Sequence, residues 1–135
     1  MTMNVIYRAG GRIFIVFSAL SLVYVAVMAM IHPQSVMDMV GVKLTNTDAI
    51  SSIRGIYGGV GITIFILLLY LAFYHIGKGI VFLIMFWGSY AASRLITWVV
   101  DGPLGDFGAN WLLIETFLSG VGLILLLIGR KIKSN

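Results

Sequence analysis

The sequence predicts an all-α integral membrane protein: a four-helix antiparallel bundle that runs up-down-up-down, with both termini cytoplasmic. Its composition indicates this class, because 60% of the 135 residues are apolar and only 10% are charged. Soluble domains are about half apolar and about a quarter charged, so a water-soluble domain is excluded. Four apolar runs each approach or exceed the ~20 residues that cross a bilayer. One transmembrane domain therefore fills residues 1–135, which leaves no room for a separate catalytic or nucleic-acid-binding domain.

Residues that start or stop helices bound the four predicted spans. We place the spans at residues 13–31, 49–74, 79–100 and 111–128. The boundary residues between them are His32-Pro33, Asn46-Thr47-Asp48, Gly77 and Asp101-Gly102-Pro103. Pro and Gly end helices, whereas Asn or Asp begins them by capping the first turn. The last two connections are short, so the helices that they join are expected to be antiparallel neighbours.

A longer loop follows the first span, and four of its residues are apolar around Asp38. These residues are Val36, Met37, Met39 and Val40. A segment of this kind can lie on the membrane surface, or it can pack as a cap over the bundle. The sequence leaves both interpretations open.

Basic residues near the span ends predict the orientation. One side of the membrane receives Arg8, Arg12, Lys78, Arg130, Lys131 and Lys133. The other side receives Asp38, Asp48, Asp101 and Asp106, with Lys43. Cytoplasmic loops are enriched in Lys and Arg, so both termini are expected in the cytoplasm, and the net charge of +4 reports topology, with no nucleic-acid partner expected. A cleaved signal peptide is the alternative for Met1–Met30, although its apolar run exceeds the usual ~7–15 residues.

Residue types that hold metals or act as nucleophiles are absent or far apart. The chain has no Cys, which excludes disulfides, thiolate catalysis and sulfur-ligated metal sites within it. His32 and His75 lie at opposite ends of spans, about 30 Å apart, so they cannot share a metal. We therefore expect no metal, no cofactor and no catalytic residue. Acid–base chemistry by Glu115 with Tyr57 or Tyr90 is the enzymatic alternative.

The lengths of charge-free sequence indicate which charges lie inside the membrane. Only 15 uncharged residues separate Lys78 from Arg94, and only 14 separate Glu115 from Arg130. These runs make roughly 22–24 Å of helix, less than the ~30 Å of hydrocarbon. Arg94 and Glu115 are therefore expected at similar depth in the outer leaflet, where a salt bridge is the natural pairing. Arg54, nearer the interface, has a side chain long enough to reach the same carboxylate.

Polar residues on the four helices are spaced to face one interior in the outer half of the bundle. The candidate ligand-binding residues of this pocket are Arg54, Tyr57, Tyr90, Arg94 and Glu115. Two arginines against one carboxylate leave a surplus positive charge, which suits a small anionic or quinone-like amphiphile, or a lipid. The segments below, such as Ile62–Leu69, carry no ionisable side chain, so a pocket is favoured over a channel.

A structural role is the alternative for the same charges. Arg54, Arg94 and Glu115 can form a buried ion triad that only fixes helix register, and Asp101 is close enough in sequence to Arg94 to supply the missing negative charge. The protein would then be a structural or accessory subunit of a larger membrane complex.

Glycines crowd one stretch of the second span. They are Gly55, Gly58, Gly59 and Gly61, and the Gly55–Gly59 pair has the spacing that permits close helix contact. Packing within the chain is the expected use, and homodimerisation is the alternative.

The run Ser52-Ile53-Arg54-Gly55-Ile56-Tyr57-Gly58-Gly59, followed by Ser93-Arg94 and then by Asp101-Gly102, resembles a known family. Its members are small bacterial four-helix membrane proteins catalogued as a domain of unknown function. The chain is more loosely similar to DoxX-like membrane proteins, some of which are linked to quinone redox chemistry. The resemblance covers the four spans and implies a bacterial inner-membrane location, with no assigned activity. The family motif falls on Arg54, Tyr57, Gly58, Gly59, Arg94, Asp101 and Gly102.

Overall fold

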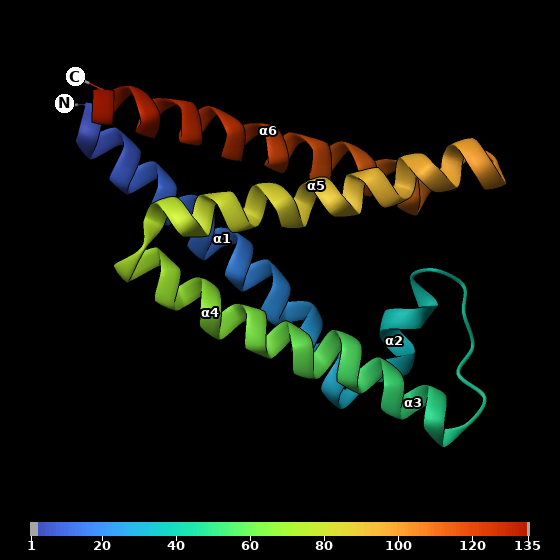
Figure 1. Ribbon diagram of the computed structural model, residues 1–135. Helices are drawn as coiled ribbons and strands as arrows, with labels where there is room; N and C mark the ends of the chain where they lie inside the picture. Colours follow the sequence, from blue (N-terminus) through green and yellow to red (C-terminus); the bar gives the residue numbers. More distant parts are fainter. Residues whose placement is uncertain (1–2, 135) are drawn as a thin grey trace. The chain divides into compact units, whose positions relative to one another are not determined.

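The computed structural model describes residues 3–134, with side chains for residues 3–132. Helices account for nearly all of this part of the chain, and it contains no strand. In order, the elements are α1 (Met3–Ile31), α2 (Pro33–Asp38), α3 (Thr47–Ile53), the π-helix η1 (Arg54–Gly59), α4 (Val60–Tyr74), α5 (Ile76–Asp101) and α6 (Asp106–Ser134) (Figure 1). The predicted all-α class is confirmed.

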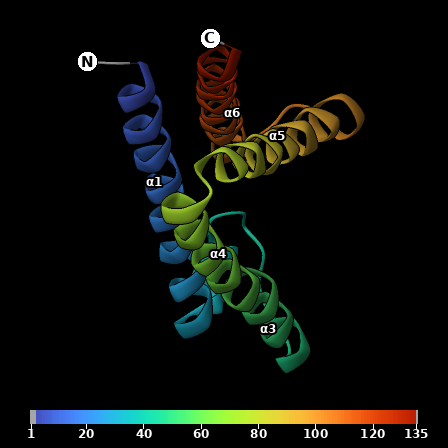
Figure 2. The same cartoon turned by 60° about the vertical axis from the view of Figure 1, so that its left-hand side comes forward.

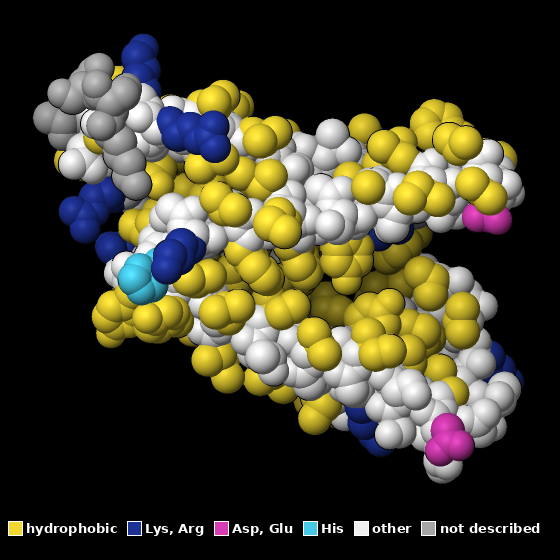
Figure 3. Space-filling view, in the orientation of Figure 1, with side chains coloured by type: hydrophobic (Ala, Val, Ile, Leu, Met, Phe, Trp, Pro, Cys, Tyr) yellow, Lys and Arg dark blue, Asp and Glu magenta, His cyan; other side chains and the backbone are white. Residues whose placement is uncertain are grey.

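Four helical stretches are long and apolar enough to cross a membrane. They are Met3–Ile31, Thr47–Tyr74, Ile76–Asp101 and Asp106–Ile132, and each contains one predicted span. Large apolar side chains are exposed along all four, as expected for helices that face lipid, and they cover much of the surface seen in Figure 3. By length and composition, the chain is a multi-pass membrane protein.

The helix ends follow the predicted boundary residues with one exception. The side chain of Asn46 accepts a hydrogen bond from the amide of Ala49 at 2.8 Å, which confirms the predicted cap. Gly102 ends α5 with φ +112°, a conformation that residues with a Cβ rarely adopt. The predicted break at Gly77 is wrong, because the helix is interrupted at His75 and Gly77 lies inside α5.

The chain divides into two compact units, and each is described by itself. Unit 1 comprises Met1–Ile15 and Leu71–Asn135, and unit 2 comprises Val16–Tyr70. That the whole chain forms a single transmembrane domain stays a prediction. In unit 1, α5 and α6 pack against each other with opposite directions (Figure 1). Gly11 of α1 lies against Ile76 of α5 at the start of this pair.

Unit 2 contains the second part of α1, then α2, α3, η1 and most of α4. Figure 2 shows α3 and α4 following each other along one line, with η1 between them. Val36 and Met37 of α2 are 6% exposed and form a buried cluster with Ala29 of α1. In contrast, Met39 and Val40 are exposed. The first two residues therefore pack within unit 2, and the choice between a surface segment and a cap over the bundle stays open.

Candidate functional site

Arg94 on α5 and Glu115 on α6 form a two-pronged ion pair in unit 1. The distance from Arg94 Nε to Glu115 Oε2 is 2.7 Å, and from Arg94 Nη2 to Glu115 Oε1 it is 2.9 Å. The carboxylate side chain is 2% exposed and the arginine side chain 21%. The structure thus confirms the predicted salt bridge. Its two parallel hydrogen bonds require the planar guanidinium of arginine, and a lysine ammonium could not form them.

Neighbouring side chains hold this ion pair in place. The Arg94 guanidinium carbon lies 5.8 Å from the ring centroid of Phe107, within cation–π range. One turn beyond Glu115, the Ser119 hydroxyl donates to the carbonyl of Ile84 at 3.3 Å, a second polar link between α6 and α5. Within the described residues, Asp101 forms no ion pair with Arg94. Each carboxylate oxygen therefore accepts a hydrogen bond from the same arginine. Acid–base chemistry by Glu115 stays a prediction.

Arg54 opens the π-helix in unit 2 and is anchored at one edge only. Its Nε donates to the carbonyl oxygen of Met30 at 3.1 Å. Met30 lies in the last turn of α1, where carbonyls lack partners within the helix and a nearby cation is favourable. The two Nη groups of Arg54 have no hydrogen-bond partner among residues 3–134. The outer part of the guanidinium fork is therefore available to a ligand.

A pocket of about 450 Å³ lies beside Arg54, entirely within unit 2. It is lined by Ile31, His32, Pro33, Gln34, Ser35, Asp38, Leu44, Ile50 and Arg54. Gln34 fixes one wall: its amide nitrogen donates to Asp38 Oδ1 at 2.6 Å and to the carbonyl of Val42 at 3.0 Å, and its amide oxygen accepts from the backbone of Leu44 at 2.9 Å. Apolar and polar side chains thus line one pocket, and hydrogen bonds of Gln34 connect the loop beside it.

The π-helix over Arg54–Gly59 is the main local feature that the sequence did not predict. The amide of Val60 donates to the carbonyl of Gly55, five residues earlier. Such segments are rare and occur often at functional sites. Tyr57, inside this segment, packs against the cluster of Ala29, Val36 and Met37. The glycines of the Arg-x-x-Tyr-Gly-Gly motif were the available signal, because they weaken regular α-helix.

The glycines of unit 2 divide into two pairs. A Cβ built at Gly58 would clash with the Met30 side chain, and one at Gly61 would lie 2.7 Å from the Ala26 Cβ. No atom lies within 4 Å of a Cβ built at Gly55 or Gly59. Close contact with α1 therefore falls on Gly58 and Gly61, which share one face. Use of Gly55 and Gly59 in helix packing or in a homodimer stays a prediction.

The five predicted pocket residues fall in both units. Tyr90, Arg94 and Glu115 belong to unit 1, whereas Arg54 and Tyr57 belong to unit 2. Their assembly into one pocket stays a prediction. The sequence did not single out Gln34, Asp38 or Leu44 as pocket residues. Across the described part of the chain, no group of three or more His, Cys, Asp or Glu side chains is placed to hold a metal ion.

Comparisons with known proteins give the family but no activity. Searches of curated proteins and of solved structures returned no match. The family model described as Domain of unknown function (DUF4345) matches residues 11–127, a range that includes the ion pair, the π-helix and the Arg54 pocket. Because the match covers most of the sequence, the chain belongs to the DUF4345 family.

Proposed function

We propose that this membrane protein binds a small amphiphile, with the head group at Arg54 in the pocket of unit 2. The proposal rests on the hydrogen bonding of the Arg54 guanidinium. Its Nε donates to the carbonyl oxygen of Met30, while both Nη groups can donate to a ligand. An arginine fork held in this way is preorganised for an oxygen acceptor such as a phosphate, a carboxylate or a quinone carbonyl. The anionic or quinone-like amphiphile, or lipid, expected from the sequence has this chemistry.

The other walls narrow the class of head group. Asp38 places one carboxylate on the pocket lining, and its Oδ1 is held by Gln34. One cation and one carboxylate suit a singly charged or neutral acceptor better than a multiply charged anion. Ile31, Leu44 and Ile50 add apolar surface where an alkyl or isoprenoid chain can lie. Tyr57, one turn along the π-helix, is proposed to support the site by packing.

Mass spectrometry of small molecules released from the purified protein tests this proposal. Wild type is compared with Arg54→Gln and with Lys43→Gln, an exposed cation of the same unit that does not line the pocket. We expect a stoichiometric amphiphile in wild type and in Lys43→Gln, and its loss from Arg54→Gln. Retention of the compound by Arg54→Gln, or its absence from wild type at equal purity, would refute the proposal.

A structural role is the second candidate, and it rests on the ion pair of unit 1. Arg94 and Glu115 satisfy each other through both prongs, so little of either group is left for a ligand. We propose that this pair, with Tyr90 one turn before Arg94, acts as helix glue, and that a larger membrane complex would use the protein as an accessory subunit. A variant without the Arg94–Glu115 pair tests this role. If it retains its amphiphile but no longer co-purifies with partner proteins, the structural role is favoured.

We also propose a location in the inner membrane of a bacterium, with both termini in the cytoplasm. The distribution of Lys and Arg along the sequence supports this orientation. Because the chain has no Cys, Asp106→Cys and Lys133→Cys each introduce a single reactive thiol. In intact cells, a membrane-impermeant maleimide should label Asp106→Cys and leave Lys133→Cys unlabelled. The reverse pattern would contradict the orientation.

A further inference from the structure

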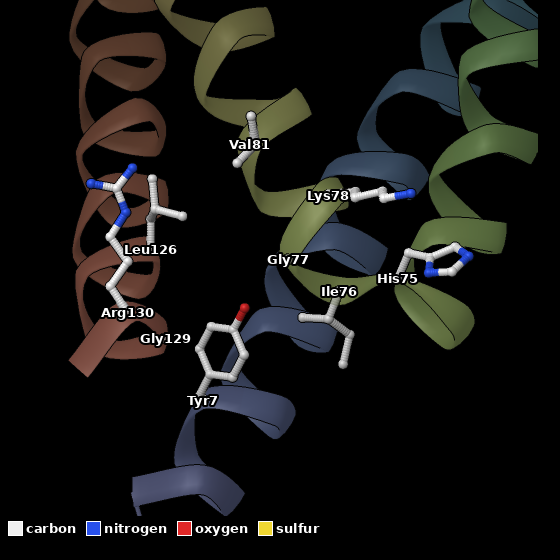
Figure 4. Close-up of a pocket in the computed structure, with 9 residues that line it drawn as sticks. All are labelled: Tyr7, His75, Ile76, Gly77, Lys78, Val81, Leu126, Gly129 and Arg130. Atoms are coloured by element: carbon white, nitrogen blue, oxygen red, sulfur yellow. The ribbon is translucent and has the colours of Figure 1, made fainter. Parts of the chain in front are cut away.

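A second pocket lies at the end of unit 1 where α1 and α5 begin and α6 ends. Its volume is about 550 Å³, and Tyr7, Lys78 and Arg130 are among the side chains that line it. Figure 4 shows the Tyr7 ring between the start of α5 and the end of α6, with its hydroxyl directed toward the space between these helices. All of its lining residues belong to unit 1, so this pocket is separate from the one beside Arg54.

Two glycines set the position of the Tyr7 ring. A Cβ built at Gly129 of α6 would lie 2.6 Å from Tyr7 Cε2, and one built at Gly77 of α5 would lie 3.3 Å from the Tyr7 hydroxyl. Any side chain at Gly129 would displace the ring, so the tyrosine occupies a place shaped for it. The wall of the pocket is therefore built from three helices, and a hydroxyl donor is fixed in it. Gly77 therefore serves as a packing residue inside α5 and does not end a helix.

The charge at this end of unit 1 has one sign. Lys78 and Arg130 line the pocket, both exposed, and no acidic side chain lines it. The sequence segments 3–15, 71–93 and 116–132, which make up this end, contain no Asp or Glu. Figure 3 shows dark blue side chains gathered at this end and magenta ones at the opposite end of α5 and α6.

We propose that this pocket binds the phosphate head group of an anionic phospholipid from the leaflet at this end of unit 1. Lys78 and Arg130 supply the attraction. In Figure 4 their charged groups extend to opposite sides of the Tyr7 hydroxyl, and both side chains are long enough to turn toward a phosphate. The Tyr7 hydroxyl donates a hydrogen bond to a phosphate oxygen. Val81 and Leu126 continue the lining as apolar surface, which fits the acyl region of a lipid and serves no purpose for a free phosphate ion.

Native mass spectrometry of the detergent-solubilised protein tests the proposal. The probes are phosphatidylglycerol and phosphatidylcholine with the same acyl chains, with inorganic phosphate as a separate competitor. Wild type is compared with Lys78→Gln/Arg130→Gln, with Tyr7→Phe and with Arg8→Gln, an exposed cation that neighbours Tyr7 in sequence and does not line the pocket. The far-ultraviolet circular dichroism of each variant checks its folding.

We expect wild type to bind phosphatidylglycerol in preference to phosphatidylcholine. At about 1 kcal/mol for each interfacial cation, loss of one of the two weakens binding about fivefold, and loss of both about thirtyfold. Arg8→Gln should bind within about twofold of wild type, because Arg8 does not line the pocket and salt screens an exposed charge that does not contact the phosphate. Tyr7→Phe retains every charge and should still bind more weakly, so it tests the site even if the double variant folds poorly.

Three outcomes would overturn the proposal. A loss in Arg8→Gln as large as the fivefold expected for one pocket cation would mean general attraction of an anionic lipid to a basic end. Equal binding of phosphatidylcholine and phosphatidylglycerol would mean that the net negative charge of the lipid does not contribute to recognition. Displacement of the lipid by inorganic phosphate at a similar concentration would make the occupant a free anion. Because the Arg54 pocket is also proposed to bind an amphiphile, each comparison is made in an Arg54→Gln background, so that the two proposals fail separately.

Discussion

Removal of one partner of the Arg94–Glu115 ion pair should destabilise the protein by an amount that depends on which partner is removed. Arg94→Leu leaves a carboxylate whose side chain is 2% exposed and whose two oxygens lose both donors. A broken buried pair of this kind costs about 3–5 kcal/mol. Glu115→Leu leaves a cation that is 21% exposed, rests near Phe107 and has a long flexible side chain. We expect a smaller cost, about 1–3 kcal/mol.

The double variant Arg94→Leu/Glu115→Leu measures how much of the stabilisation comes from the interaction between the two side chains. It removes both charges, and apolar replacements of a buried pair are often nearly neutral, so the free energy of unfolding should return to within about 1.5 kcal/mol of wild type. The coupling energy between the two sites is then about 2 kcal/mol or more. Thr97→Ala is the matched control, because Thr97 lies on the same helix and is exposed, and within residues 3–134 its hydroxyl bonds only to the carbonyl of Ser93.

The assay is reversible unfolding in mixed micelles by titration with SDS, followed by far-ultraviolet circular dichroism. The expected order of destabilisation is Arg94→Leu, then Glu115→Leu, then the double variant, with Thr97→Ala within about 0.5 kcal/mol of wild type. Two results would refute the reasoning. One is a larger loss for Glu115→Leu than for Arg94→Leu. The other is a double variant whose loss equals the sum of the single losses, since the two side chains would then act independently.

The same unfolding assay tests two further predictions, and a third variant has its own readout. In Gly61→Ala the new Cβ would lie 2.7 Å from the Ala26 Cβ, so the free energy of unfolding should fall by about 1–3 kcal/mol. In Gly59→Ala the new Cβ has no atom within 4 Å, so stability should not fall. Equal losses in the two variants would contradict this contact pattern. Gly102→Ala forces a Cβ onto φ +112° and should lose about 1–3 kcal/mol, while an unchanged midpoint would mean that the turn relaxes freely. Ser119→Ala removes the 3.3 Å hydrogen bond to the carbonyl of Ile84, so the free energy of unfolding should fall by about 0.5–1.5 kcal/mol. Hydrogen exchange of the α6 amides near this turn should become faster, and unaltered exchange would argue against the link.

Much of the architecture could be predicted because it depends on quantities that a sequence displays directly. The apolar runs fix which helices are long enough to cross a membrane, since hydropathy and length decide this. The Arg94–Glu115 pair followed from counting uncharged residues, because short runs place both charges at one depth on helices that are consecutive in the chain. The Asn46 cap followed from local chemistry that needs no partner from elsewhere.

The parts that could not be predicted depend on contacts that residue type and spacing do not specify. Gly77 looked like a helix breaker, but its small size accommodates Tyr7, which lies seventy residues earlier in the chain. The π-helix at Arg54–Gly59 has no periodic signal in the sequence, because glycines weaken an α-helix without specifying what replaces it. The wall built by Gln34 depends on three hydrogen bonds that span up to ten residues, and a polar side chain in a loop gives no sign of them.

The most direct test of the Arg54 pocket is to identify, by photo-crosslinking, what occupies it in the native membrane. A photoreactive benzoylphenylalanine replaces Ile50, which lines the pocket, and in a control it replaces Ile56, which is 63% exposed and does not line it. Mass spectrometry then identifies the adducts. We predict one discrete amphiphile on the Ile50 variant, its loss when Arg54→Gln is added, and only the bulk lipid mixture on the Ile56 variant. The same lipid mixture at both positions, unaffected by Arg54→Gln, would contradict the account.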